Sequence, residues 1–190
     1  WMARRASEIK TDGNLLSSTP LETTGWMPAR VPGTVLTTLL ENGLYPAPEF
    51  GMNNNLIPDI YEAGNDFYTY WFVCRFETPE VPDDRIVWLN FRGINYKAEL
   101  FMNGKRLNNN THEGMFLRKS FNITELLRKE DTNVLAVLVY PPDYPGNPNG
   151  GQGGDGQIAR NNTMQYTPGW DWVQPIRDRN TGIWDEVSVT

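Results

Sequence analysis

Two tryptophans flank an aspartate near the C-terminal end of the chain, in the run Gln165-Tyr166-Thr167-Pro168-Gly169-Trp170-Asp171-Trp172. Exposed tryptophans offer flat apolar faces that match the C–H face of a pyranose ring, and an aspartate between them can hydrogen-bond sugar hydroxyls. The charged run Arg177-Asp178-Arg179 follows soon after and offers further charge-assisted hydrogen bonds. These residue types at this spacing predict a carbohydrate-binding site.

Each of these residues also has a structural interpretation. A single tryptophan fills a core more often than a binding site, and this holds for the two in the run and for Trp184. The charged run 177–179 can instead form an ion-pair cluster that braces the loop, and one of its arginines can neutralise Asp171. Both interpretations stay open on the sequence alone, and the surrounding segment favours the functional one.

The segment from Pro141 to Thr181 has neither an alternating nor a helical apolar pattern, and it is rich in proline and glycine. Loops beyond about 12–15 residues are usually functional or disordered, and disordered segments are poor in aromatic residues. Because Tyr166 and the two tryptophans lie in its second half, we expect that half to be ordered and functional. The glycine-rich run 147–156 lacks the Lys-Ser/Thr of a P-loop, which disfavours phosphate binding.

Composition narrows the classes of partner. The chain has 190 residues, enough for one domain with a sizeable core, and a formal net charge of −6. This acidic balance argues against nucleic-acid and anionic-membrane partners, which select basic faces. No apolar run approaches the length of a membrane helix, so no membrane span is expected. Aromatic residues make up 12% of the chain, as suits an all-β carbohydrate-binding domain.

The chain has one cysteine, Cys74, and one histidine, His112. This excludes an intramolecular disulfide and a Cys/His zinc site, and we expect neither a metal nor a cofactor. Cys74 stands in an apolar run and is interpreted as a buried filler, whereas His112 stands in a polar run that predicts a loop. Neither supports a nucleophile–histidine triad. One cysteine suits any compartment, and a carbohydrate ligand favours the periplasm or the exterior.

Short apolar segments at close spacing, with turn residues between them, predict an antiparallel sandwich. A capping threonine and a helical apolar spacing predict one short helix over 34–43. The predicted strands cover 67–76, 86–91, 98–102, 105–107, 115–123, 133–140 and 182–189. Asn103-Gly104 joins the third and fourth of these as a hairpin. We expect a single all-β jelly-roll domain over 1–190, with the loop 141–181 at one rim carrying the site.

With these elements in order, the chain resembles the N-terminal sugar-binding domain of glycoside hydrolase family 2, a jelly roll of the galactose-binding-domain-like type. The resemblance covers most of the chain. It rests on four motifs in sequence order, Pro32-Gly33-Thr34, the aromatic strand Tyr68 to Phe76, Phe101-Met102-Asn103-Gly104 and Asn133-Val134-Leu135-Ala136-Val137.

The segments Gly151 to Asp155, Gly169 to Trp172 and Pro175 to Val187 look like those of the endo-β-mannosidase, β-mannosidase and exo-β-glucosaminidase subgroup. In that subgroup the Gly-Trp-Asp-Trp loop reaches the mouth of a separate catalytic (β/α)8 barrel. The resemblance implies a carbohydrate substrate of the β-mannoside or β-glucosaminide class and a barrel in the same polypeptide as partners. The substrate-binding residues it implies, more loosely for the last three, are Trp170, Asp171, Trp172, Arg177, Asp178 and Arg179.

The same resemblance implies that no residue of this chain is catalytic. Family 2 enzymes retain configuration with two glutamates about 5–5.5 Å apart, and both belong to the barrel. Glu186 beside Asp185 on a predicted strand is interpreted as a solvated strand face. We therefore expect the fragment to be inactive and its parent to be a retaining glycoside hydrolase. A freestanding carbohydrate-binding module is the alternative, and a self-sufficient hydrolase is disfavoured.

Overall fold

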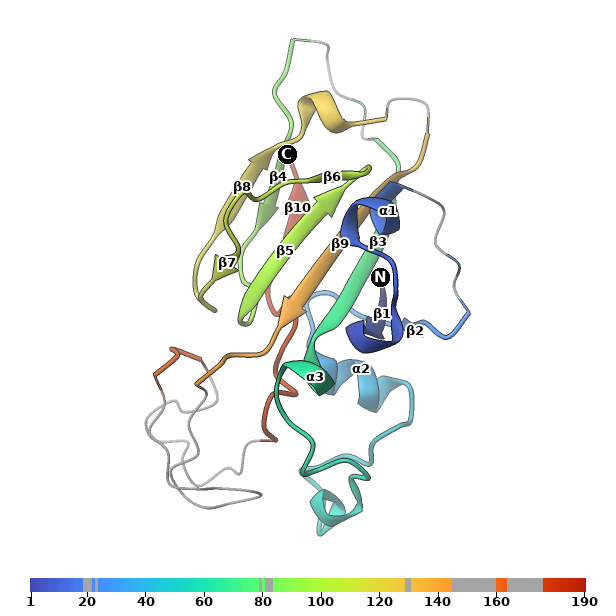
Figure 1. The fold of residues 1–190 in the computed structure, drawn as a ribbon, viewed down its shortest axis with the longest axis vertical. Coiled ribbons are helices and arrows are strands. Elements are labelled where there is room, and N and C mark those ends of the chain that lie inside the picture. Colours follow the sequence, from blue (N-terminus) through green and yellow to red (C-terminus); the bar gives the residue numbers. More distant parts are fainter. Residues whose placement is uncertain are drawn as a thin grey trace.

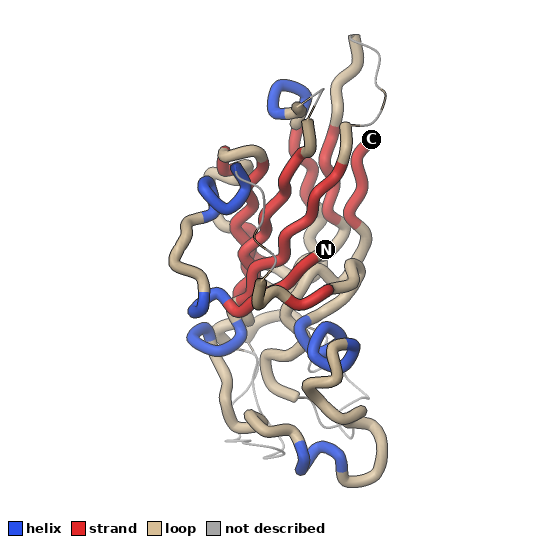
Figure 2. The backbone as a smooth tube through the Cα atoms, turned by 90° about the vertical axis from the view of Figure 1, so that its right-hand side faces the viewer, coloured by secondary structure: helices blue, strands red, loops and turns tan. Residues whose placement is uncertain are grey.

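The computed structural model of the chain (Figure 1) describes residues 1–18, 22, 24–78, 80, 84–128, 131–144, 160–163 and 176–190. Over these residues the strands form two antiparallel sheets. Figure 2 shows the strands gathered in the upper half of the molecule, with loops and short helices extending below them. The prediction of an all-β antiparallel sandwich is confirmed.

The larger sheet has the strand order β2-β1-β3-β9-β5-β6, and β7 also pairs with β5. Its strands are β1 (Met2–Arg5), β2 (Met27–Pro28), β3 (Tyr70–Phe76), β5 (Lys97–Met102), β6 (Lys105–Arg106), β7 (His112–Glu113) and β9 (Asn133–Tyr140). The smaller sheet has the order β10-β4-β8, with β4 (Trp88–Phe91), β8 (Lys119–Asn122) and β10 (Val187–Val189). The helices are α1 (Gly13–Ser18), α2 (Val35–Glu41) and α3 (Asn65–Tyr68), with single turns η1 (Ala6–Glu8), η2 (Asn53–Leu56) and η3 (Thr124–Leu126).

Strand β3 lies inside the larger sheet, between β1 and β9, and both of its faces are covered. Successive side chains of a strand point to opposite faces. Tyr70 and Phe72 accordingly join the main core, while Trp71 and Val73 join a second cluster with Leu16 of α1. Burial on both faces explains why this strand reads as a continuous apolar run rather than an alternating one.

The main core fills the space between the two sheets. Leu100 of β5 and Val137 of β9 contribute to it from the larger sheet, and Leu89 and Phe91 of β4 contribute from the smaller one. Ile183, which follows the long loop, is also fully buried there. The chain therefore returns from its loop directly into the core.

Helix α2 begins where the sequence predicts. The Thr34 side chain accepts a hydrogen bond from the Thr37 N–H (3.3 Å), and the Thr34 N–H donates to the Thr37 hydroxyl (2.8 Å). This capping box satisfies backbone donors that the first turn of a helix leaves free. The threonine of the Pro-Gly-Thr motif thus fixes the start of the helix.

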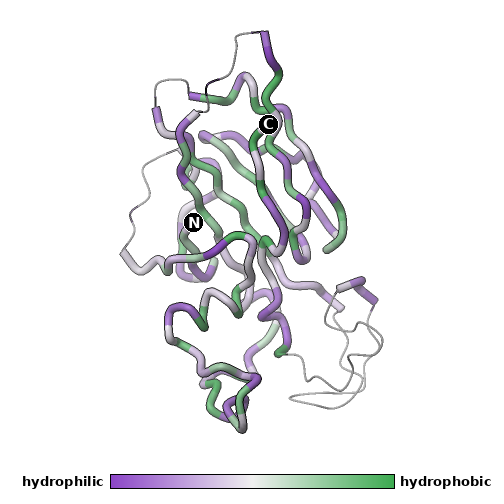
Figure 3. The backbone as a smooth tube through the Cα atoms, turned by 180° about the vertical axis from the view of Figure 1, so that it is seen from behind, coloured by the Kyte–Doolittle hydropathy of each residue, from purple (hydrophilic) through white to green (hydrophobic). Residues whose placement is uncertain are grey.

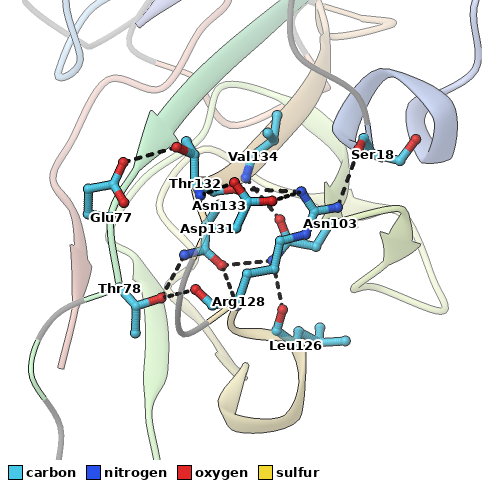
Figure 4. Close-up of polar contacts among 10 residues, drawn as sticks. All are labelled: Ser18, Glu77, Thr78, Asn103, Leu126, Arg128, Asp131, Thr132, Asn133 and Val134. Carbon is cyan, nitrogen blue, oxygen red and sulfur yellow. Dashed lines mark hydrogen bonds and ion pairs between the residues drawn. The ribbon is translucent and has the colours of Figure 1, made fainter.

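The Asn-Gly hairpin and the Asn-x-Leu-x-Val strand meet in one hydrogen-bonded network (Figure 4). Asn103 Nδ2 donates to the Leu126 carbonyl (2.7 Å) and to Asn133 Oδ1 (2.8 Å), and Asn103 Oδ1 accepts from the Val134 N–H (2.9 Å). Asn133 is fully buried, and its Nδ2 donates to the Thr78 hydroxyl (2.8 Å). Asn103 has φ 50°, a conformation that asparagine tolerates well. Two motifs far apart in sequence therefore form one structural unit.

Several element predictions differ from the structure. The predicted strand over 67–76 begins only at Tyr70, because Asn65–Tyr68 form α3. The predicted strands over 86–91, 115–123 and 182–189 are shorter in the structure, where they are β4, β8 and β10. The predicted loop around His112 is wrong: the residue lies in β7, is 3% exposed, and shares a hydrogen bond through Nε2 with the Gly114 carbonyl (3.1 Å). Burial holds the pKa of His112 below its ordinary value.

Candidate functional site

The predicted site residues fall into two groups. Trp170, Asp171 and Trp172 lie outside the described residues. The charged run 177–179 is described, and it occupies a turn that leads back into the sandwich. Its geometry shows how the end of the long loop is anchored.

Arg179 has no exposed surface. Its Nη1 donates to the carbonyls of Glu62 (2.6 Å) and Arg177 (2.8 Å), and its Nε donates to the Tyr45 hydroxyl (3.4 Å). Its guanidinium carbon lies 4.1 Å from the centre of the Tyr68 ring, a cation–π contact. Through these several hydrogen bonds, the planar guanidinium joins the loop end to residues 45–68.

Asp59 supplies the negative charge beside this guanidinium. Its Oδ1 lies 3.7 Å from Arg179 Nη2, and Arg179 Nη2 also donates to the Asp59 carbonyl. The Tyr68 hydroxyl donates to Asp59 Oδ2 (2.6 Å), and the Tyr45 hydroxyl donates to Oδ1. Burial opposes ionisation of this carboxyl, but the two tyrosines and Arg179 outweigh it, and the pKa of Asp59 lies below its usual value.

The N-terminal strand reaches the same cluster. Arg5 of β1 places Nη2 3.5 Å from Asp59 Oδ2, and its guanidinium carbon lies 5.8 Å from the centre of the Tyr68 ring. The hydroxyls of Tyr45 and Tyr68 are 3.0 Å apart. We call the five residues Arg5, Tyr45, Asp59, Tyr68 and Arg179 the brace. It holds three segments together: the N-terminal strand, residues 45–68 and the loop end.

Asp178 lies beside the brace and is 2% exposed. Its backbone has φ 64°, a region that aspartate visits more readily than most residues. Oδ2 accepts a hydrogen bond from the Gly64 N–H (2.6 Å) and lies 3.7 Å from Arg177 Nε, while buried Oδ1 has no partner. Burial raises the pKa of Asp178 despite these contacts.

Replacement Asp178→Asn is expected to flatten the pH dependence of stability. A raised pKa means that the folded chain holds this proton to a higher pH than the unfolded chain, whose carboxyl titrates near pH ~3.9. The resulting stability is present below that pH and is lost as pH rises through the folded pKa. The free energy of unfolding, measured with urea from pH 4 to 7, should fall less with rising pH for Asp178→Asn than for the wild type. If the free energy of unfolding changes with pH in the same way for both proteins, the pKa of Asp178 is not raised in the folded chain.

The Pro-Gly-Thr motif and the first residues of α2 hold the segment that follows the loop. The Gly33 N–H donates to the Ile183 carbonyl, the Val35 N–H to the Thr181 carbonyl and the Leu36 N–H to the Arg179 carbonyl, each at 2.8 Å. The backbone from 179 to 183 is therefore fixed along the start of α2. The Pro-Gly-Thr motif therefore helps to position the returning end of the loop.

The loop departs from the same end of the sandwich as it returns (Figure 1). Asp143 forms an ion pair with Lys97 of β5. Tyr144 is exposed, its N–H donates to Asn161 Oδ1 (2.5 Å), and the Arg160 guanidinium lies 5.3 Å from its ring centre. Residues 141–144, 160–163 and 176–183 together frame the base of the loop.

Sequence reasoning missed the brace partners of Arg179. Tyr45, Asp59 and Tyr68 lie more than 100 residues before it in the chain, so no local spacing connects them. The structure favours the ion-pair bracing that the sequence allowed for 177–179, and contact of these residues with sugar stays a prediction. In the described residues no three His, Cys, Asp or Glu side chains gather to hold a metal ion. The helices described are too short or too polar to span a bilayer.

The family model "Glycosyl hydrolase 2 galactose-binding domain-like" matches residues 1–185. The chain belongs to this family. A mannosylglycoprotein endo-beta-mannosidase of Lilium longiflorum is 50% identical over 194 residues, which cover 100% of this chain and 20% of the relative. An exo-beta-D-glucosaminidase of Streptomyces avermitilis is 31% identical and is covered over 18% of its length.

The fold agrees with a solved relative. A crystal structure of an exo-chitosanase from Amycolatopsis orientalis superposes with a TM-score of 0.76 at 23% identity, over 100% of this chain and 20% of that one. The chain spans about a fifth of the length of the curated relatives it matches. The resemblance to family 2 and the galactose-binding-domain-like sandwich predicted from the sequence are confirmed.

Proposed function

We propose that this chain is the non-catalytic sugar-binding domain of a longer family 2 glycoside hydrolase, packed on a separate catalytic barrel and contributing contacts to the substrate. The observation that carries the proposal is the family match over residues 1–185 together with relatives of which it spans about a fifth. The names of the relatives support a substrate of the β-mannoside or β-glucosaminide class.

The substrate contacts are assigned to Trp170, Asp171 and Trp172. An aspartate flanked by two tryptophans suits a site that grips hydroxyls beside a stacking face. The brace supports this assignment indirectly, because Arg179 fixes the backbone a few residues after the three. Within the run 177–179, Arg179 acts as a positioning residue, since its surface is buried and Nε, Nη1 and Nη2 all donate to other groups of the protein.

Replacement Asp171→Asn in the full-length polypeptide tests the assignment. Asparagine keeps the shape of aspartate but removes its charge, so a substrate contact predicts at least a ~10-fold fall in kcat/KM, equivalent to about 1.4 kcal/mol, with little change in Tm. Aryl β-mannosides and β-glucosaminides are the substrates to use. The 190-residue chain alone should release no aryl alcohol above buffer.

Asp131→Asn is the matched control, because Asp131 is exposed and lies near η3 and β9, away from the loop base. It should leave kcat/KM unchanged. If Asp171→Asn stays within about twofold of wild type, a difference under ~0.4 kcal/mol, the site assignment is wrong. Micromolar binding of a mannoside by the isolated chain would favour a freestanding carbohydrate-binding module instead.

A further inference from the structure

Exposed apolar side chains concentrate in one segment below the sandwich. We call residues 44–61, between α2 and α3, the arm. Among the described residues, five of the eleven large apolar side chains that are exposed lie in this arm, with exposed fractions from 53% to 84%. They are Leu44, Phe50, Met52, Leu56 and Tyr61. Single exposed apolar residues are ordinary on a protein surface, whereas several gathered in one short segment indicate an interaction site.

The arm is held in place from both of its ends. Tyr45 and Ile57 are 7% and 3% exposed and belong to the main core. Asp59 is fixed by the brace, and Asn53 Nδ2 donates to the Ala47 carbonyl across the turn (3.0 Å). Figure 3 shows hydrophobic stretches on this lower part of the molecule. A surface that is ordered before binding loses less conformational entropy when a partner covers it.

The arm also has a one-sided charge. Between Arg30 and Arg75 the chain contains no lysine, arginine or histidine. The acidic residues of that stretch include Glu49 and Asp66, which are both exposed, whereas Asp59 is neutralised in the brace. A complementary partner therefore presents an apolar surface bordered by lysine or arginine side chains.

The same charges argue against a second copy of this chain as the occupant. In a two-fold symmetric contact the same patch meets itself, so the exposed carboxylate of Glu49 would be brought toward its copy on the other arm. Like charges brought together at an interface are unfavourable. The net charge of −6 adds to this repulsion.

We propose that the arm is the surface on which the remaining part of the same polypeptide docks, through an apolar patch with a basic border. This rests on the proposed function, because it requires a longer parent protein. Two observations favour this occupant. The relatives extend about four-fifths of their length beyond the matched segment. The brace joins the arm to the described loop end through Arg179, so the arm and the returning end of the loop lie at the same end of the sandwich.

Hydrogen exchange of the arm amides tests the docking. Amides of residues 44–61 should exchange at least ~10-fold more slowly in the full-length polypeptide than in the isolated 190-residue chain. The double variant Phe50→Ser/Met52→Ser should remove most of this difference in the full-length protein. Both side chains are about three-quarters exposed, at 76% and 74%, so the isolated chain should keep its own Tm. Ile86→Ser is the control, because Ile86 is 59% exposed and lies outside the arm, before β4.

The outcomes separate this inference from the proposed function. Equal exchange of the arm in both proteins would overturn the docking, even if Asp171→Asn impairs hydrolysis as expected. Slow exchange of the arm in a full-length protein without glycosidase activity would support the docking and contradict the function. Protection in the isolated chain that grows with its concentration would identify a second copy as the occupant and overturn the proposal.

Discussion

Replacement Arg179→Met is expected to lower the free energy of unfolding by about 3–5 kcal/mol, the range measured when one partner of a buried ion pair is removed. Methionine keeps the unbranched apolar stem but removes every hydrogen bond of the guanidinium. The partly buried carboxylate of Asp59 then keeps Arg5 alone as its cation, and the carbonyl of Glu62 loses its donor. Equilibrium urea unfolding followed by tryptophan fluorescence measures the change.

Arg30→Met is the matched control. Arg30 pairs with Glu41 at 3.0 Å, but its side chain is 73% exposed, and surface pairs of this kind contribute about 0–1 kcal/mol. Arg179→Lys keeps the charge without the fork of donors and should fall between the wild type and Arg179→Met. If Arg179→Met unfolds with a free energy within about 1 kcal/mol of wild type, the brace does not hold the loop end as its geometry indicates.

The fold could be predicted where the signal is local. Asn103-Gly104 predicted its hairpin because the turn requires backbone angles that these residues adopt readily, and Thr34 predicted the start of α2 because its hydroxyl can cap the helix. The apolar run 67–76 predicted a strand, and the structure places β3 there, between β1 and β9. The turn α3 was missed because Phe67 and Tyr68 have the aromatic composition of the strand that follows.

The sugar contacts of the candidate site stay a prediction, whereas the way in which the loop end is anchored could not be predicted from the sequence. The residue types in the run 165–172 predict a sugar site without any knowledge of the fold. The brace was not predictable, because Arg179 meets Tyr45, Asp59 and Tyr68 only after the sandwich has closed. A buried arginine and an exposed one look the same in a sequence. Charged residues near a predicted ligand loop can therefore anchor the loop instead of contacting the ligand.

The two glycines of the loop return show the same limit. Gly33 was noticed as part of a motif, whereas Gly182 was not singled out, although both stand where the chain comes back to α2. Gly182 exchanges two backbone hydrogen bonds with Asn95, both at 2.8 Å, and has φ 151°. A Cβ added to it would lie 2.7 Å from the Gly33 carbonyl oxygen. The requirement for glycine comes from a backbone 149 positions earlier in sequence, and not from any local turn.

Replacement Gly182→Ala is therefore expected to destabilise the chain by about 2–4 kcal/mol, the sum of an unfavourable backbone conformation and of overpacking against fixed backbone. Gly43→Ala is the matched control, because Gly43 has φ 68° but its added Cβ would meet nothing within 4 Å. Gly43→Ala should lower the free energy of unfolding by about 1 kcal/mol, which is the cost of the unfavourable backbone conformation alone. Urea unfolding of both variants gives the difference, which isolates the clash with the Pro-Gly-Thr turn. If Gly182→Ala and Gly43→Ala lower the free energy of unfolding equally, the Pro-Gly-Thr turn can move away from the added Cβ, and the loop end is not fixed there.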